Sequence, residues 1–145
     1  MKFAVLALVF VLVSCSTGYN REWKQVLAKT TGAAPRDLTG PWQGTWRSEA
    51  RGNNGGLRCI VTREDGSSGR CRFHYHATYH KIFSATYDVY HVVRVHGGGF
   101  VFSGEQKLTG PGGGLYSYEG KGTPSQFSAT FRSGSDHGVF ELRRP

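Results

Sequence analysis

From Gly40 onward the chain consists of short runs in which apolar and polar residues alternate, separated by glycine, proline and serine. Alternation with a period of two is typical of β-strands, because successive side chains point to opposite faces. Dividers such as Gly97-Gly98 and Gly110-Pro111-Gly112-Gly113 indicate turns rather than helices. The pattern predicts eight strands, at Trp42–Ala50, Leu57–Arg63, Arg70–Tyr79, Ser84–Val95, Gly99–Lys107, Gly114–Lys121, Gln126–Ser133 and Gly138–Arg143.

The spacing of these strands also predicts how they connect. Short links between consecutive runs favour an up-and-down meander, and eight strands suffice to close it into a barrel. In the seventh run Phe127, Ala129 and Phe131 share one face, as residues do when they point into a core. We therefore expect an all-β fold, an eight-stranded up-and-down antiparallel meander barrel preceded by a short N-terminal helix.

Residues 1–14 form a pattern typical of an export signal, in which Lys2 is followed by an apolar run from Phe3 to Val13. This run is shorter than the roughly 20 residues needed to span a membrane. Its end, Leu12-Val13-Ser14-Cys15, resembles the lipobox of bacterial lipoproteins. The resemblance implies that 1–14 is a signal peptide and that Cys15 is lipidated, with acyl chains such as palmitate. Ordinary secretion without a lipid stays open as the alternative.

The same resemblance implies a location. A lipidated Cys15 would anchor the chain to a membrane of the bacterial cell envelope. Ser16 follows the cysteine where an aspartate would retain the protein, which implies the outer membrane. Residues 15–39 are then a lipid-attached tether, and residues 40–145 are the barrel domain.

A short helix is expected within the tether. Asn20 is a good helix N-cap, and the residues after it suit a helix. Trp23, Val26 and Leu27 have the spacing that places them on one side of such a helix. This apolar stripe can pack on the barrel or lie on the membrane beside the lipid, and packing is the commoner arrangement.

Cys59 and Cys71 are predicted to pair, because an exported chain folds where disulfides form. They flank Glu64-Asp65-Gly66-Ser67-Ser68-Gly69, which is a hairpin signal. A three-residue loop from Glu64 to Gly66 would place the two cysteines directly opposite each other, within reach of a cross-strand disulfide. Two free thiols are the alternative.

The two ends of the predicted barrel carry a further pattern. Gly40-Pro41-Trp42 and Gly44-Thr45-Trp46 open the first strand, and Arg143-Arg144 follow the last one. A Gly-x-Trp motif with a late arginine resembles the calycin superfamily, the lipocalins and avidins. The resemblance implies that an arginine stacks on a tryptophan and closes one end of the barrel. The Thr-Asp-Tyr motif of lipocalins is absent, and the three tryptophans lie at positions 23, 42 and 46, so biotin binding is not implied.

An eight-stranded barrel either is filled by side chains or holds one small ligand. The many inward-facing aromatic residues favour a filled interior. If a small apolar ligand is bound, we expect it at the barrel mouth, lined by Tyr75, Tyr79, Tyr87 and Tyr116.

Two histidines suggest a metal site. His74 and His76 share one face of a predicted strand and lie about 6.6 Å apart along it. Two such imidazoles can bind zinc, with His91 or Asp88 of the next strand as a third ligand. The strand register decides between these two, because a one-residue slip reverses the faces. The alternative function is therefore a zinc-binding protein or a metal-dependent hydrolase.

The charge points to anionic partners. Eighteen Lys and Arg residues face ten Asp and Glu, and the formal charge of +8 becomes +7 without Lys2. Export makes nucleic acid an unexpected partner, so we expect an anionic envelope lipid or glycan. No Gly-x-Ser-x-Gly motif is present, and no catalytic residue is assigned. The sequence thus predicts a noncatalytic lipid-anchored envelope protein, a binding or structural β-barrel, without a cofactor unless zinc is bound.

Overall fold

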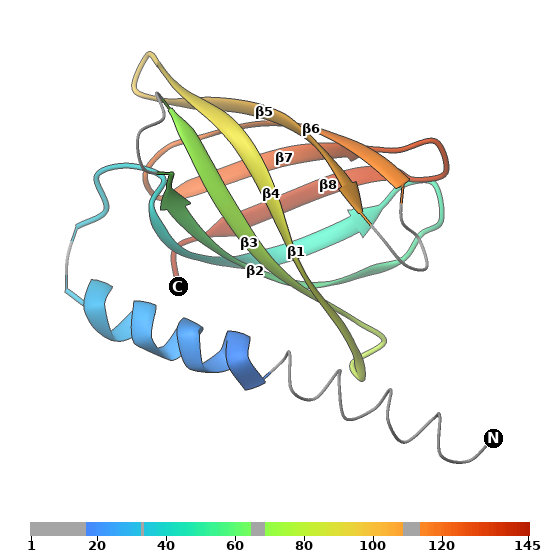
Figure 1. Cartoon of the computed structure of the whole chain (residues 1–145), viewed down its shortest axis with the longest axis horizontal. Helices are drawn as coiled ribbons and strands as arrows, with labels where there is room; N and C mark the ends of the chain where they lie inside the picture. Colours follow the sequence, from blue (N-terminus) through green and yellow to red (C-terminus); the bar gives the residue numbers. More distant parts are fainter. Residues whose placement is uncertain (1–16, 33, 65–68, 109–113) are drawn as a thin grey trace.

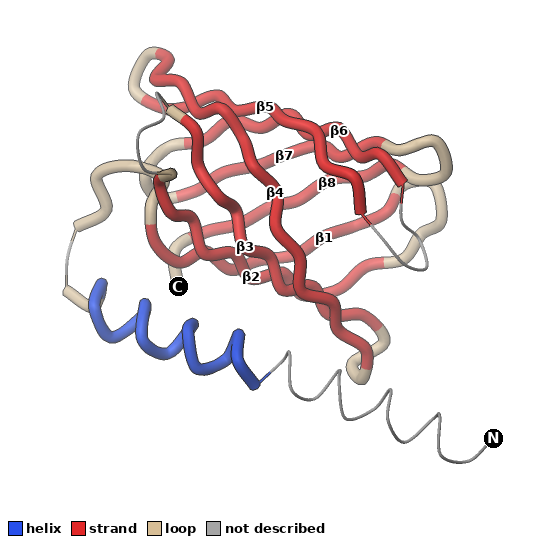
Figure 2. Tube along the Cα trace, in the orientation of Figure 1, coloured by secondary structure: helices blue, strands red, loops and turns tan. Residues whose placement is uncertain are grey.

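A computed structural model describes residues 17–32, 34–64, 69–108 and 114–145 of the chain, and the predicted signal and Cys15 lie outside these ranges. The fold is a closed barrel of eight antiparallel strands, in which each strand pairs with the next along the chain and β1 pairs with β8 (Figures 1 and 2). The predicted up-and-down barrel is therefore confirmed. The strands are β1 (Gly40–Ser48), β2 (Asn54–Arg63), β3 (Arg70–Tyr79), β4 (Phe83–His96), β5 (Gly99–Leu108), β6 (Gly114–Gly122), β7 (Gln126–Arg132) and β8 (His137–Arg143).

Aromatic rings fill the barrel. Phe73 of β3 is fully buried and lies 5.0 Å, centroid to centroid, from Phe102 of β5. Phe127 of β7 meets the edge of Trp42 of β1 at 4.7 Å. Phe73 also lies 6.2 Å from Phe127, so rings of β3 and β7 meet across the barrel, and burial of such side chains stabilises the fold by roughly 2–3 kcal/mol each.

An arginine after β8 closes one end of the barrel. The Arg144 guanidinium stacks on the Trp42 ring at 3.9 Å. It also donates hydrogen bonds to the carbonyl oxygens of Asp37, Thr39, Pro41 and Pro124, at 2.6 to 3.2 Å. Its planar fork of donors thereby joins the segment before β1, the β6–β7 connection and the end of β8.

The neighbouring residues of the predicted closure group behave differently. Arg143 is on the outer face of β8 and is exposed. The Trp46 indole N–H donates to the carbonyl of Thr78, at the far end of β3, over 2.9 Å. Gly44, between the two tryptophans, lies so close to the Glu141 carbonyl of β8 that any larger residue would clash with it.

The N-terminal helix, residues 17–30, packs against the outside of the barrel (Figure 1). Tyr19 and Trp23 are buried there with Ile60 of β2, while Val26 and Leu27 pack around them. The predicted apolar stripe therefore faces the barrel. The predicted N-cap is wrong, because the chain is already helical at residue 17, and Asn20 instead accepts a hydrogen bond from Arg58 at 3.4 Å.

The predicted disulfide between Cys59 and Cys71 is also wrong. Both cysteines are buried and free. Cys59 lies opposite Tyr75, and Cys71 lies opposite Arg63, so the hairpin is four residues out of the expected register. The loop is longer than the three residues expected, and the Glu64 N–H closes it by donating to the Arg70 carbonyl at 3.0 Å. Four residues along a strand separate the thiols by about 13 Å, too far for a bond.

Candidate functional site

The tyrosines predicted to line an interior pocket are mostly part of the packed core. Tyr75 is buried, and its ring lies 5.4 Å from the rings of both Tyr87 and Phe140. Tyr116 lies 6.3 Å from Phe131. Burial raises the pKa of Tyr75 and Tyr87 well above the usual value, so both stay neutral. These rings stabilise the fold and leave little room for an interior ligand.

The fourth of these residues, Tyr79, lies apart from the others. It is the last residue of β3 and stacks on Phe83, the first residue of β4, at 5.3 Å. Its side chain is 38% exposed. The structure therefore brings three of the four predicted pocket tyrosines into the core and places the fourth at a hairpin tip.

His91 of β4 is the most unusual polar residue of the core. Its side chain is fully buried between Phe73, Phe102 and Tyr118, and neither ring nitrogen has a hydrogen-bond partner in the described part of the chain. Burial lowers its pKa from 6.5 to about 4. His91 is therefore neutral near pH 7, and its protonation would place a charge among the aromatic rings of the core.

His91 does not join the other predicted zinc ligands, which corrects the proposed metal set, whereas Asp88, the alternative third ligand, lies beside His74. His74 and His76 point outward from β3, whereas His91 points into the barrel. The cause is the β3–β4 register, which places His91 opposite Cys71 and Asp88 opposite His74. No group of three metal-ligating side chains occurs among the residues that the structure describes.

Outside the barrel, His74 belongs to the seam under the helix. Its Nδ1 lies 2.6 Å from Oδ1 of Asp88, and its Nε2 lies 3.5 Å from Oε2 of Glu22 on the helix. Tyr19 donates its hydroxyl to the His74 carbonyl at 3.2 Å and stacks on His76 at 4.8 Å. The two histidines thus bind the helix to β3.

A solvent-open groove of about 1330 Å³ lies on the barrel surface, and much of its lining comes from outward-facing residues of β1, β2 and β5 to β8. We call this surface the outer groove. Two rows of outward side chains, read across neighbouring strands, form its floor. One row contains Thr45, Glu141, Ser128, Lys121 and Val101, and the other contains Arg58, Gln43, Arg143 and Gln126.

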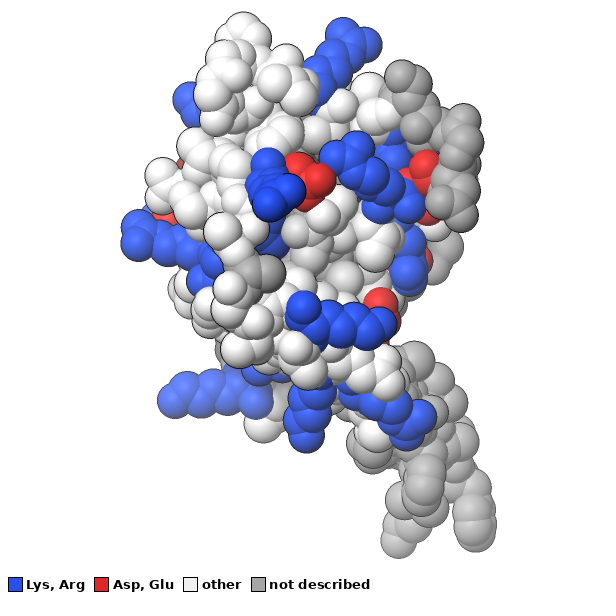
Figure 3. All heavy atoms as spheres, turned by 90° about the vertical axis from the view of Figure 1, so that its left-hand side faces the viewer, with Lys and Arg blue, Asp and Glu red and all other residues white. Residues whose placement is uncertain are grey.

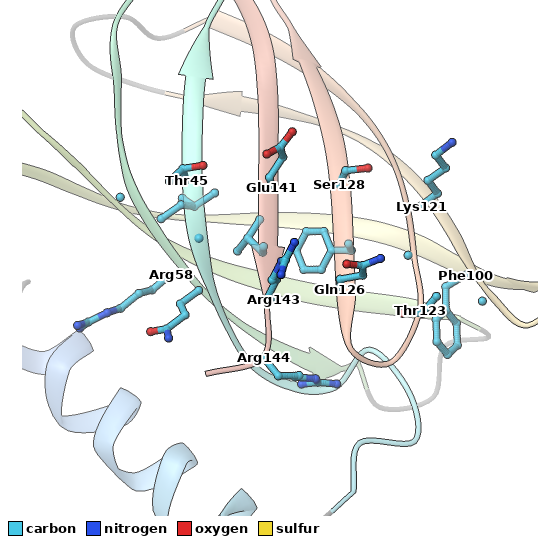
Figure 4. Close-up of a pocket in the computed structure, with 18 of the residues that line it drawn as sticks. Thr45, Arg58, Phe100, Lys121, Thr123, Gln126, Ser128, Glu141, Arg143 and Arg144 are labelled. Atoms are coloured by element: carbon cyan, nitrogen blue, oxygen red, sulfur yellow. The ribbon is translucent and has the colours of Figure 1, made fainter.

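Three charged side chains of the outer groove are available to a ligand. Arg143, Lys121 and Glu141 form no side-chain hydrogen bond or ion pair with any described residue, unlike Arg58, which stacks on Trp23 at 5.2 Å. Figure 4 shows Arg143 beside Gln126, with Glu141 and Ser128 further along the same two strands. The groove therefore offers two separated cations, one carboxylate, and the amides and hydroxyls around them.

Sequence reasoning did not find the outer groove. Lys121, Gln43 and Gln126 were not singled out, and Arg143 was assigned to barrel closure. The sequence does contain a signal for the groove, because consecutive strands carry polar residues at their outward positions. Predicting which of these residues lie side by side requires the register of six strands.

Positive charge is spread over the surface rather than gathered in one patch. Figure 3 shows one face of the barrel on which Lys and Arg side chains are separated by uncharged residues, with few Asp or Glu among them. This distribution suits a ligand whose anionic groups are spaced apart.

Comparison with family models, with curated proteins and with solved structures found no match to this chain. Within the described ranges, no helix has the length and hydropathy needed to cross a membrane.

Proposed function

We propose that this chain is a noncatalytic, lipid-anchored binding protein of the bacterial cell envelope, and that its ligand is an acidic glycan held in the outer groove. The observation that carries the proposal is the contrast between a packed interior and a groove with unpaired charges. The lipobox-like Leu12-Val13-Ser14-Cys15 supports the anchor. The stack of Arg144 on Trp42 supports a relation to calycins.

The arrangement of charges favours an acidic sugar over a phosphate-rich ligand. Arg143 can bind a carboxylate through two parallel hydrogen bonds, and Lys121 can bind a second anionic group. Glu141 lies two residues from Arg143 along β8, and in the same cross-strand row as Lys121. Its carboxylate would repel closely spaced phosphates but accepts hydrogen bonds from sugar hydroxyls. Gln43 and Gln126 add amide donors and acceptors that also suit hydroxyl groups.

The test is titration of the purified lipid-anchored protein in detergent with polygalacturonate, measured by calorimetry. We expect the double variant Arg143→Gln, Lys121→Gln to bind roughly tenfold more weakly, a loss of about 1.4 kcal/mol. Binding by the unmodified protein should weaken as salt is added, because exposed charge pairs are screened.

Arg132→Gln is the matched control, since Arg132 is an exposed cation of β7 that does not line the groove. It should bind as the unmodified protein does. The control removes one positive charge and the double variant removes two, so a loss of binding free energy in the control half as large as in the double variant would mean that only net charge matters. Binding of neutral dextran as tightly as polygalacturonate would also contradict the proposal.

A further inference from the structure

The β3–β4 hairpin ends in an exposed apolar tip, which we define as residues Tyr79 to Phe83. Ile82 is 81% exposed, Phe83 48% and Tyr79 38%. The Tyr79 and Phe83 rings stack on each other at 5.3 Å and form a rigid base below Ile82. Figure 1 shows this hairpin projecting beyond the other strands. An apolar cluster of this kind, held out into solvent, indicates a surface that meets an apolar partner.

The backbone at the apolar tip is strained in a way that presents these side chains. His80 and Lys81 have positive φ angles of 51° and 63°, which residues other than glycine seldom adopt. Such strain is a feature of functional positions, and glycine at either place would relieve it. The connections at 49–53, 97–98, 123–125 and 133–136 contain no large apolar residue. Among the fully described connections between strands, the β3–β4 tip is therefore distinctive.

This end of the barrel carries more cations than acids, as the surface does elsewhere (Figure 3). The β1–β2, β5–β6 and β7–β8 connections lie at this end with the tip, because the strands alternate in direction. Described charged residues within two positions of these four connections comprise five cations and two acids. They are Arg47, Arg51, Lys81, Lys107 and Arg132, against Glu49 and Asp136. A basic rim around an apolar tip complements an anionic lipid surface.

The helix begins on the side of the barrel nearer to this end. Tyr19 in its first turn stacks on His76, whereas Trp23, one turn later, is buried with Ile60, which is opposite His74. Since β3 runs from His74 through His76 to Tyr79, the first described residues of the helix lie on the side of the apolar tip. Cys15, the proposed anchor, precedes the helix by two positions in sequence.

We infer that the apolar tip inserts into the headgroup region of an anionic phospholipid membrane, as a second contact beside the lipid at Cys15. The inference rests on the proposed anchor for its choice of a membrane as partner. Ile82 and Phe83 enter the lipid boundary, and Lys81 and the basic rim contact lipid phosphates. Two contacts at separate places fix the orientation of the barrel more closely than a single contact does.

The test uses the lipid-anchored protein in vesicles of phosphatidylglycerol and phosphatidylethanolamine. A fluorophore is attached to the variant Ile82→Cys or, as the matched control, Val95→Cys. Val95 is 78% exposed near the opposite end of β4, and neither substitution disturbs the core. Native Cys59 and Cys71 are buried and do not compete for the label. Quenching by brominated lipid is measured at both positions.

We expect quenching several-fold greater at position 82 than at position 95, and reduced when phosphatidylcholine replaces the anionic lipid. A chain that does not float with vesicles contradicts the anchor. A chain that floats but shows equal quenching at both positions overturns the tip contact alone. Spontaneous disulfide dimers of the unlabelled Ile82→Cys variant would show that the tip instead binds a second copy, and would also overturn the inference.

Discussion

At the scale of single residues, Arg144 is the side chain that joins most separate segments. One face of its guanidinium covers Trp42, and its edge donates to four carbonyl oxygens. The Trp42 indole in turn donates to the Leu38 carbonyl at 2.9 Å. These contacts supply hydrogen-bond donors to carbonyl groups of the segment before β1, of β1 itself and of the β6–β7 connection.

We predict that Arg144→Lys lowers the free energy of unfolding by about 3 kcal/mol, because lysine keeps the charge but loses the planar donors and the stack on Trp42. Urea unfolding followed by tryptophan fluorescence measures the change. Arg143→Lys is the control, and it should stay within about 0.5 kcal/mol of the unmodified protein because Arg143 is exposed. Equal stability of the two variants would contradict the role given to Arg144.

A stack of an arginine on a tryptophan was implied by the calycin resemblance, which did not distinguish Arg144 from Arg143 or Trp42 from Trp46. The inward position of His91 could not be predicted from the sequence. In this strand two alternating sets of residues both contain apolar side chains, namely Tyr87, Val89 and His91 and, on the other face, Asp88, Tyr90 and Val92. The structure selects the set that keeps the Asp88 carboxylate outside. Burying an unpaired aspartate costs more free energy than burying a neutral histidine, and this comparison would have decided which face of the strand points inward.

At the scale of elements, the β2–β3 hairpin shows what alternation can and cannot decide. Its strands were expected at nearly the observed positions, and its inward faces were fixed by the pattern. The pattern did not fix the pairing register between β2 and β3, because a shift of four residues leaves every side chain on the same face. Gly66 and Gly69 each allow a turn, so the residues permitted two loop lengths.

The helix is held on the outside of the barrel by side-chain contacts. Tyr19 and Trp23 bury its apolar side, and Arg58 lies over the Trp23 ring. We predict that Trp23→Ala releases the helix from the barrel without unfolding the strands, since no strand depends on the helix for its backbone pairing. Hydrogen exchange should become faster across residues 20–30 while β6 and β7 stay protected.

Lys24→Ala is the control for this experiment, because Lys24 is exposed on the opposite side of the helix. Its exchange should match that of the unmodified protein. Faster exchange throughout the barrel in Trp23→Ala would mean that the helix and the strands unfold as one unit.

At the scale of the whole molecule, all the strands of a closed barrel enclose the same buried interior. Inward side chains of all eight strands belong to one hydrophobic cluster. An unfavourable charge in that cluster therefore destabilises every strand. His91 is the titratable group placed to introduce such a charge, and burial also lowers the pKa of His76 at the seam.

We predict that the barrel loses stability in mild acid. The pKa of His91 is about 4 in the folded chain and 6.5 when unfolded, so the unfolded state binds more protons below pH 6.5. The stability that the barrel gains from keeping His91 neutral is complete above pH 6.5 and decreases toward pH 4. The free energy of unfolding falls by about 2 kcal/mol between pH 7 and pH 5. Urea midpoints at the two pH values measure it.

His91→Leu, which is similar in volume and cannot be protonated, should reduce this dependence on pH, while the His76 contribution remains. His80→Leu changes an exposed histidine at the hairpin tip and is the control. A His91→Leu chain that loses as much stability between pH 7 and pH 5 as the unmodified protein would contradict the assignment.

The two reduced cysteines inside the barrel have a consequence for how the chain must mature. For a protein exported as proposed, Cys59 and Cys71 meet the oxidising enzymes of the envelope before they are enclosed. A bond formed at that stage would lock the β2–β3 hairpin four residues away from its final pairing. Folding therefore competes with oxidation in time, and the maturation of the chain depends on whether the β2–β3 hairpin pairs before the two thiols are oxidised.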